Sequence, residues 1–520
     1  MNWEHRKTTL PAPHSRQLIP PLGPIGLGCA ILMACLSGVG CQTAEVCSRR
    51  HVVDAELATR VGMSLGPHAP PGVVSVPDSV QIEDGISADE AVTTALWNNA
   101  AFQEALAQLG ISRAQLLDAG LFPDPQVQIF LPLGPKQFEL TGYQALDALW
   151  LRPIRQRAAE LDLVRVTDQL VQNGLNVIRD VRLAHANLLM AQQQLELADE
   201  TLELRQEIAR LAKKRADAGA ISELEAAAPK IDALQAEADR SRALGEIEFS
   251  RAQLLILMGL PESGCELVAV GASLPNCRVA CTDDLIAEAL AVRPDLRAAE
   301  INVQAAAERL ELAKCRWMTF DGILDMNSQG TQGFEAGPGM RFTIPFFNGN
   351  RGQVAIAEAN LEAAQRQFVT IRDQIRNDVL SAHARWVQAT RTLDDMRSKV
   401  LPATEEASEL AQKNYESGGT SYLLTLQTLG QYLSARGQEI ALAADVRRAL
   451  AELDRSVGHR VKCEAAVEET NIPYLPAPNE IAPLPDEVEA DKRTSNERLP
   501  ACRPVSFEIK PTDDSGDRKP

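Results

Sequence analysis

The sequence predicts a mainly helical protein with a small β part, built from two copies of one unit: helix, two strands, long helix, turn, helix. Ala, Leu, Glu, Gln and Arg dominate after residue 85, as in long helices and coiled coils. Three matches follow in one order, 194 to 199 positions apart: Ala95-Leu96 with Ala289-Leu290, 180–186 with 378–384, and Gly219 with Gly418. They indicate an internal duplication of a unit far longer than a solenoid repeat of about 20–50 residues.

The first 41 residues predict a secretory signal. Arg6 and Lys7 precede an apolar run, 25–39, that is too short for a comfortable membrane-spanning helix. The run ends in Gly-Val-Gly before Cys41, which is similar to a bacterial lipoprotein cleavage site, where the Cys becomes the acylated first residue. We therefore take Cys41 as the candidate lipid anchor. Acylation of Cys35 and ordinary cleavage without lipid are the alternatives.

Charge and cysteine content restrict the function. The net charge of −18 argues against a nucleic-acid partner, because phosphate binding requires a basic face. Cys265, Cys277 and Cys281 cluster between the two units, and export permits a local disulfide with one thiol left over. A metal site there is disfavoured, since no His lies nearby and the spacing fits no zinc pattern. The sequence shows no catalytic constellation and no cofactor motif, so we expect no enzyme.

The first unit is expected over 87–264. Before it, 42–86 is rich in Gly, Pro and Val and predicts an extended arm. Ser87 and Glu90 predict a capping box for one helix to about residue 119. Strands follow within about 123–148, the first with alternating apolar and polar residues over 126–131. A helix from about 154 to 217, a hairpin tip at about 216–222 and a return helix to about 258 complete the unit.

The second unit is expected over 282–458, after a linker at 265–281. It repeats the plan with one helix over about 283–316, strands within about 318–345 around a glycine-rich turn, a long helix broken at Pro402, a hairpin tip at about 415–421 and a return helix to about 457. The tail 459–520 is rich in Pro, Asp and Glu with few aromatic residues, which predicts disorder.

Four strands of about ten residues suit a barrel in a bilayer, but they are too few to close one, because about eight are needed merely to enclose a filled interior. An open sheet edge in lipid leaves backbone groups unpaired at several kcal/mol each. Several copies must therefore share one barrel. Each long helix of some sixty residues is a rod of roughly 95 Å, and the rods of those copies can pack into a hollow tube.

Four short motifs carry a family resemblance: Tyr-x-x-Gly-x-x-Ser at 415–421, Pro-Phe-Phe-Asn-Gly-Asn-Arg at 345–351, Leu-Met-Gly-Leu-Pro at 257–261 and Phe-Pro-Asp-Pro at 122–125. With them, the chain resembles the TolC-like outer-membrane efflux proteins over about residues 87–458. The last motif is similar to the heavy-metal-efflux branch of the CusC and CzcC type. The resemblance implies a homotrimer with a twelve-stranded outer-membrane barrel and a periplasmic helical tunnel.

The resemblance also implies the partners: a periplasmic adaptor protein at the hairpin tips and, through it, an inner-membrane pump, expected to be of the resistance–nodulation–division type. The protein would be a passive exit duct. Two alternatives stay open. One is a lipid-anchored periplasmic coiled-coil scaffold without a pore, and the other is the outer-membrane component of a type I secretion system. Strands that alternate in polarity between the rods favour a duct, because a scaffold does not need them.

The tips are the candidate adaptor contacts, with Gly219, Ser222, Tyr415, Gly418 and Ser421 as the residues expected there; the alternative is that each Gly only ends a helix. The first tip has Ala216 where the family has Tyr. In several relatives, acids six and nine residues beyond the second Gly narrow the tunnel. Those places hold Leu424 and Gln427 here, which favours an apolar constriction.

Three further residues need a role. Glu225 occupies the equivalent place after the first tip, where a capping box with Ser222 competes with lining of the pore. His185 and His383 lie at matching positions of the repeated phrase, with no second ligand four residues on. We therefore expect packing or a hydrogen bond at each His, not a metal.

Overall fold

The computed structural model describes only part of the chain: residues 49–68, 70–78, 80, 84–131, 138–260, 266–274, 277–278, 281–328, 333–343, 346–461 and 464–465. The signal segment with Cys41 and Cys35 lies outside the described residues, as do Cys265 and the tail from residue 466 onward. Within the described ranges the chain is mainly helical with a small antiparallel sheet, as the sequence predicts.

The elements of both halves follow the same order. The first half contains α3 (Ala88–Asn98), α4 (Ala100–Gly120), β1 (Gln126–Phe130), β2 (Phe138–Ala145), α5 (Ala148–Asp217) and α6 (Glu223–Met258). The second half contains α7 (Thr282–Val292), α8 (Pro294–Cys315), β4 (Phe320–Ser328), β5 (Phe334–Phe342), α9 (Arg351–Asp395), the π-helix η3 (Met396–Val400), α10 (Leu401–Glu416) and α11 (Tyr422–Val457).

Two expectations outside the halves are wrong. The arm 42–86 contains a twelve-residue helix, α2 (Arg50–Val61), whose residues Val53, Leu57 and Val61 repeat every four positions and are buried. This spacing forms one apolar face that packs on α5. The tail 459–520 begins with an ordered strand, β6 (Glu464–Ala465), which pairs with β3 (Cys277–Arg278) in the predicted linker.

The helix before the strands is two helices in each half, where the sequence predicted one. Asn99 leaves the helical region with ψ 114°, and its side chain accepts a hydrogen bond from the backbone N–H of Phe102, so it ends α3 and caps α4. Arg293 has ψ 129° and precedes Pro294, which sterically disfavours the helical conformation of the residue before it. Both breaks thus have local causes.

Three boundaries also differ from the prediction. α5 starts at Ala148, six residues before the predicted start, and keeps Pro153 near its beginning. β5 starts at Phe334, inside the predicted glycine-rich turn, and contains Pro338; within the chain, β5 pairs with β4 on one side only. The predicted break at Pro402 is preceded by the π-helix η3, which accommodates the backbone where the Pro lacks a donor.

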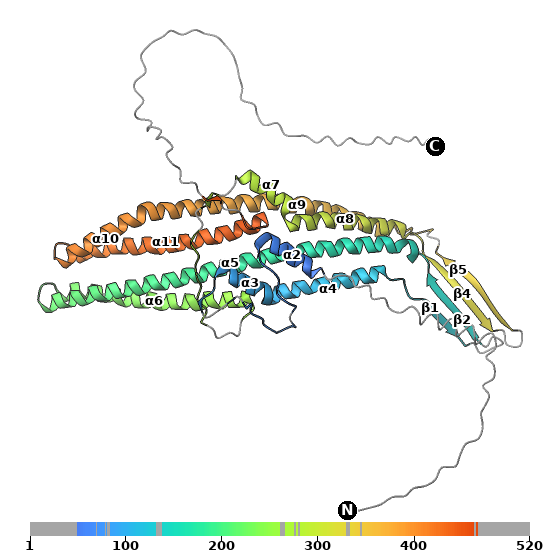
Figure 1. Ribbon diagram of the computed structural model, residues 1–520, viewed down its shortest axis with the longest axis horizontal. Coiled ribbons are helices and arrows are strands. Elements are labelled where there is room, and N and C mark those ends of the chain that lie inside the picture. Colours follow the sequence, from blue (N-terminus) through green and yellow to red (C-terminus); the bar gives the residue numbers. More distant parts are fainter. Residues whose placement is uncertain are drawn as a thin grey trace, which may run out of the picture. The chain divides into compact units, whose positions relative to one another are not determined.

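The sheet and the hairpin turns lie at opposite ends of the long helices (Figure 1). The larger apolar core lies in the first half and includes Phe102, Leu188 and Leu254. A second cluster in the other half includes Ile375 and Leu453. Among the described residues, none of the helices is both long and apolar enough to cross a membrane.

Candidate functional site

The four-stranded sheet has one apolar and one polar face. Its strands run antiparallel in the order β1-β2-β4-β5, and residues paired in register share a face. One face carries Val127, Ile129, Leu140, Leu324, Met326, Met340 and Phe342. The other carries Gln126, Gln128, Glu139, Thr141, Tyr143, Asp321, Asp325, Glu335 and Arg341. The alternation predicted for the first strand thus extends over all four strands, except that Phe130 and Ile323 lie on the polar face and Gln144 and Ser328 on the apolar face.

Polar side chains link the strands across the polar face. Arg341 Nη2 lies 2.8 Å from Asp321 Oδ2, and its guanidinium lies 4.7 Å from the centre of the Tyr143 ring. The Tyr143 hydroxyl donates to Gln128 Oε1 at 3.2 Å. The Thr141 hydroxyl donates to Asp325 Oδ1 at 2.8 Å. These contacts are made within one chain, so the polar face needs no further protein to satisfy them.

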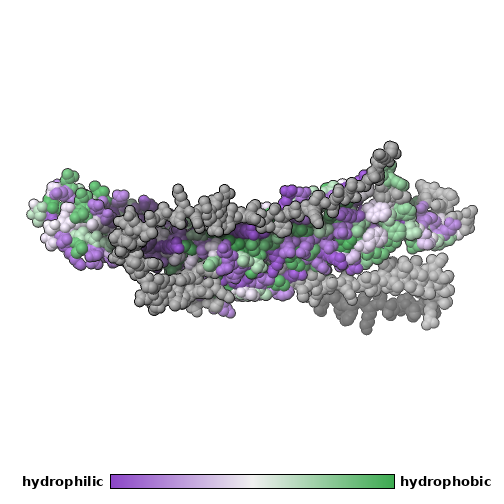
Figure 2. All heavy atoms as spheres, turned by 90° about the horizontal axis from the view of Figure 1, so that it is seen from above, coloured by the Kyte–Doolittle hydropathy of each residue, from purple (hydrophilic) through white to green (hydrophobic). Residues whose placement is uncertain are grey.

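Most side chains of the apolar face are exposed in the part of the chain that the structure describes. Ile129 is 58% exposed and Met340 is 69% exposed, on strands at opposite edges of the sheet. Figure 2 shows apolar residues, in green, at the surface toward this end of the molecule. A contiguous exposed apolar face of this kind marks a contact with lipid or with another protein.

The first hairpin tip is a tight turn with a capped return helix. Gly219 has φ +72°, a conformation that glycine adopts without strain. Ser222 and Glu225 form a capping box: the Ser222 backbone N–H donates to Glu225 Oε2 at 2.8 Å, and the Glu225 N–H donates to Ser222 Oγ at 3.2 Å. Hydrogen bonds from the backbone and hydroxyl of Ser222 lower the pKa of Glu225. The capping role predicted for Glu225 is confirmed.

The second tip has the same turn but a simpler cap. Gly418 has φ +81°, and Ser421 Oγ accepts a hydrogen bond from the backbone N–H of Leu424 at 3.4 Å. Leu424 stands where the first tip has Glu225, so it cannot return the second bond of a capping box. Leu424 and Gln427 are both exposed on α11.

The two tips are tied to each other. The Arg215 guanidinium lies 4.5 Å from the centre of the Tyr415 ring and donates to the Tyr415 carbonyl at 2.8 Å. The rings of Tyr415 and Tyr422 lie 6.2 Å apart, and the Tyr422 hydroxyl donates to Asp232 Oδ2 at 2.6 Å. Burial and the hydrogen bond to Asp232 raise the pKa of Tyr422. Tyr415 is only 5% exposed as a result.

Sequence reasoning singled out Tyr415 but missed Arg215, Tyr422 and Asp232. These residues come from both hairpins, and no motif spacing brings them together. One residue in the sequence could have indicated this contact: Ala216 leaves the first tip without an aromatic ring next to Arg215. In the structure Arg215 instead packs on the ring of the second tip.

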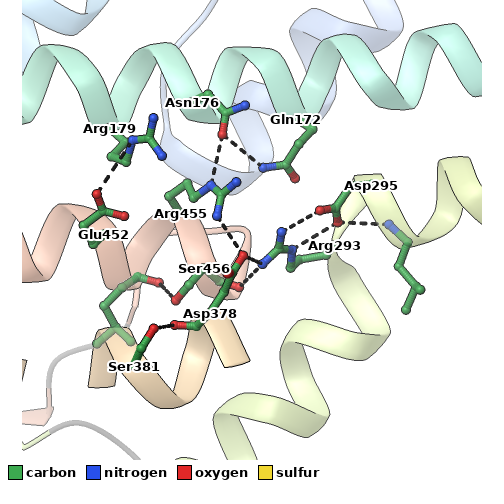
Figure 3. Close-up of polar contacts among 12 residues, drawn as sticks. Gln172, Asn176, Arg179, Arg293, Asp295, Asp378, Ser381, Glu452, Arg455 and Ser456 are labelled. Carbon is green, nitrogen blue, oxygen red and sulfur yellow. Dashed lines mark hydrogen bonds and ion pairs between the residues drawn. The ribbon is translucent and has the colours of Figure 1, made fainter. Parts of the chain in front are cut away.

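A buried ionic cluster joins the two halves midway along the helices (Figure 3). Arg293, with 2% of its side chain exposed, contacts Asp295 and Asp378 and donates to the Ser456 carbonyl at 3.1 Å. Arg455 donates to Asp378 Oδ2 at 2.9 Å and to Asn176 Oδ1 on α5 at 3.0 Å. Asp378 therefore holds two arginines and connects the second half to the first.

Both histidines of the repeated phrase make one hydrogen bond to the segment that starts a helix. His185 Nε2 lies 2.9 Å from the Ile86 carbonyl, just before α3, and His383 Nδ1 lies 3.0 Å from Thr282 Oγ1, the first residue of α7. Burial lowers the pKa of both rings. The hydrogen-bond interpretation is confirmed. Across the described ranges, no three His, Cys, Asp or Glu residues are placed to hold a metal ion, and Cys281 is a free thiol.

Comparison with known proteins shows which proteins this chain is similar to. Residues 285–459 match the family model described as outer membrane efflux protein. The cobalt-zinc-cadmium resistance protein CzcC of Cupriavidus metallidurans is 20% identical over 387 residues, which are 72% of this chain and 90% of CzcC. The pyoverdine export outer membrane protein OpmQ of Pseudomonas putida is 26% identical over 332 residues, 59% of this chain and 67% of OpmQ.

Solved structures agree with the fold over most of the described chain. The outer-membrane channel OprN superposes with a TM-score of 0.62 at 17% identity, covering 76% of this chain and 99% of that one. A structure of CusC superposes with a TM-score of 0.61 at 16% identity, with the same coverage. The motifs at the tips and the strand–helix junction and these matches point in one direction: the chain is similar to the TolC-like outer-membrane efflux proteins, in sequence to CzcC and in fold to CusC.

Proposed function

We propose that this chain is a subunit of the outer-membrane exit duct of a tripartite efflux system. It conducts substrates passively from an inner-membrane pump and a periplasmic adaptor to the outside. The observation that carries the proposal is the two-faced sheet beyond one end of the helices. An exposed apolar face opposite a hydrogen-bonded polar face suits a barrel wall with lipid outside and water inside.

The sheet edges support a trimer. β1 and β5 each pair on one side only within the chain, so each leaves a row of backbone donors and acceptors. Pairing β5 of one copy with β1 of the next removes both edges, and three copies give a twelve-stranded barrel. Exposed apolar residues on one face of α6 would pack on the neighbouring copy: Ile231, Leu234, Phe249 and Ile256. The shared element order of the two halves supports the duplication.

The hairpin tips are the proposed adaptor surface. They lie at the end of the helices away from the sheet (Figure 1), and they expose apolar side chains such as Leu224, 82% exposed, and Leu423. Gly219, Ser222, Gly418 and Ser421 shape the two turns, while Tyr415 supports them from the buried side. Leu424 and Gln427 are the proposed constriction. Glu225 is taken up by its cap, which favours that role over pore lining.

The length of the chain is compatible with a lipid anchor at Cys41. The eight residues between Cys41 and Arg50 can span about 28 Å, and α2 up to Glu56 adds about 9 Å. Glu56 pairs with Arg297 at 3.3 Å, and Arg297 pairs with Asp168 on α5. Asp168 lies twenty residues, or about 30 Å, along α5 from the strand end. The anchor can therefore reach the bilayer around the sheet. Loss of metabolic palmitate labelling in Cys41→Ser would test it.

The two alternative functions can be distinguished from the exit duct, the scaffold by the sheet and the type I secretion component by the pump. A pore-free scaffold has no use for a sheet with one face in lipid. A type I secretion component would share the duct and differ in the pump that feeds it. The names of CzcC and OpmQ, for cobalt-zinc-cadmium resistance and pyoverdine export, assign unlike substrates to two relatives. We infer that the pump selects the substrate.

The faces of the sheet provide the test. Ile129→Cys and Met340→Cys place a thiol on the apolar face, and Gln128→Cys places one on the polar face. In outer-membrane vesicles, a water-soluble maleimide should label Gln128→Cys and spare the other two, relative to the unsubstituted protein with its native thiols. In detergent-free urea all three should react. Equal labelling of both faces in vesicles would contradict a membrane barrel and favour the scaffold.

A further inference from the structure

A cavity of about 500 Å³ lies midway along the helices, away from both the sheet and the tips. It is lined by the start of α3, by α5 and α11, and by the segment 270–274. Its volume is within the range of about 300–1,000 Å³ that is usual for small-molecule sites. Part of its wall is apolar and comes from Ala186, Val270, Leu274, Leu450 and Val461.

The carboxylates of this cavity are already bound. Asp454 Oδ2 lies 2.7 Å from Arg182 Nη1, and its Oδ1 accepts the Val461 backbone N–H at 2.9 Å. Asp89 contacts Arg182 and Arg460, each at 3.3 Å. Burial lowers the pKa of His185, which also lines the cavity, so the ring adds no cation at neutral pH. Two acids are thus shared between Arg182 and Arg460.

Arg447 is the third arginine that lines the cavity. It donates to the Ala443 carbonyl at 3.2 Å and to the Ala272 carbonyl at 3.3 Å, and among the described residues no carboxylate pairs with it. Glu439, whose charge acts on Arg447, is paired with Arg397 at 2.6 Å. Burial, and then the charge of Arg397, lower the pKa of Arg447. The cavity therefore carries one excess positive charge on a half-buried guanidinium.

We propose that this cavity binds a small organic carboxylate. The carboxylate would take the N–H groups of Arg447 that the two carbonyls leave free, since a guanidinium has five donors in a planar fork. The organic part would lie against the apolar wall at Ala186, Leu274 and Leu450. A monoanion matches the single excess charge, and the apolar wall favours an organic acid over an inorganic anion.

Such a ligand would join the two halves, because Ala186 is on α5 and Arg447 is on α11. Binding to the folded protein alone raises its melting temperature with ligand concentration. The inference goes beyond the exit-duct function and does not depend on it. A measurement of the melting temperature or of binding tests the inference without a measurement of channel conductance.

Benzoate is the probe, and benzamide is its uncharged counterpart of nearly the same shape. With the full-length protein in detergent, isothermal titration should show benzoate binding and raise the melting temperature, whereas benzamide should bind at least about tenfold more weakly. Arg447→Gln should weaken benzoate binding about tenfold or more, and Arg447→Lys should weaken it less. Arg113→Gln on α4 is the matched control, because it removes a positive charge away from the cavity.

A second variant tests the cavity without changing its charge. Ser273 is exposed at the cavity wall, so Ser273→Trp should fill the space and abolish binding while the protein still folds. The proposal is overturned by equal binding of benzoate and benzamide, by unchanged benzoate binding in Arg447→Gln or Ser273→Trp, or by inorganic phosphate binding as tightly as benzoate. That last outcome would mean that the cavity binds any anion and does not select an organic acid.

Discussion

Each half has a helix break at an equivalent position, and the two breaks are stabilised by different side chains. In the first half, Asn99 Nδ2 donates to the Leu257 carbonyl at 2.8 Å. In the second half, Arg293 Nη1 donates to the Ser456 carbonyl at 3.1 Å. Asn99 and Arg293 are 194 positions apart, the offset of Ala95 and Ala289, and Leu257 and Ser456 are 199 apart, the offset of Gly219 and Gly418. The bond between break and return helix therefore occurs twice.

The difference lies in what each break requires from its surroundings. A neutral amide is satisfied by two local bonds, and Asn99 also caps α4. A buried guanidinium must be neutralised, and Arg293 has Asp295 and Asp378 for this purpose. Asp378 in turn holds Arg455, which reaches Asn176 of the first half. The charged break is thus part of the contact between the halves, whereas the neutral one is local.

The largest effect is expected from Arg293→Met. It removes a buried cation from Asp295 and Asp378, and breaking such a pair costs about 3–5 kcal/mol. Asn99→Ala, which removes two neutral bonds, should cost about 1–2 kcal/mol. Urea unfolding followed by the helical signal would measure both. Arg366→Met, at an exposed ion pair on α9, is the control and should change little. Equal costs at Arg293 and Asn99 would contradict the distinction.

The glycines that end the return helices provide a second comparison between the two helix breaks. Gly259 has φ +73° and Gly458 has φ +94°, and alanine in this conformation costs about 1–2 kcal/mol. An added Cβ at Gly259 would lie 2.3 Å from the Asn98 backbone oxygen, whereas at Gly458 it would lie 3.1 Å from Cγ of Arg293, which can shift. Gly259→Ala should therefore lower the melting temperature more than Gly458→Ala. The reverse order would show that the first break is the looser one.

At the tips, Tyr422→Phe should loosen the tie between the hairpins. It removes the hydrogen bond to Asp232 and keeps the ring beside Tyr415, so the expected loss is about 1 kcal/mol. Hydrogen exchange should speed up in the peptides of both tips and stay unchanged around Arg293. Tyr432→Phe, which removes a hydroxyl farther along α11, serves as the control. Exchange confined to the second tip would mean that the bond does not couple the hairpins.

The smallest effect is a pH dependence that separates the tips. The pKa of Glu225 is lowered from its ordinary value of 4.5, so its cap is fully present above pH 4.5 and is lost as pH falls through the lowered pKa. Exchange at the first tip should rise in that range, and the second tip, with Leu424 in the same place, should not respond. Glu225→Gln should remove the response. A matching response at the second tip would assign the effect to another group.

Much of the fold could be predicted because its signals are local or repeated. The duplicated phrase, the glycine turns and the alternating strand 126–131 give the order of elements and their places. The capping boxes at Ser87 and Ser222 were also predictable, since three-residue spacing is a property of one helix start. The breaks at Asn99 and Arg293 were missed, although Pro294 was a usable signal for the second.

The contacts between segments could not be predicted. The pairing of Tyr422 with Asp232 and of Arg215 with Tyr415 depends on how two hairpins lie side by side, which the spacing within either hairpin does not determine. The same holds for Arg447: that no described carboxylate pairs with it depends on how three segments pack together. Helix α2 was missed because the Gly and Pro residues that follow it, from Gly62 onward, were taken to describe the whole arm, although Val53, Leu57 and Val61 repeat every four positions.

Single-channel recording tests the central claim most directly. Full-length protein purified in detergent and inserted into a planar bilayer should give discrete conductance steps, and its mass in detergent should correspond to three chains. Ile129→Asp, a charge on the apolar face, should reduce insertion, because an acid on the lipid side of a strand is costly. A silent bilayer together with the mass of a single chain would contradict the duct and leave the pore-free scaffold.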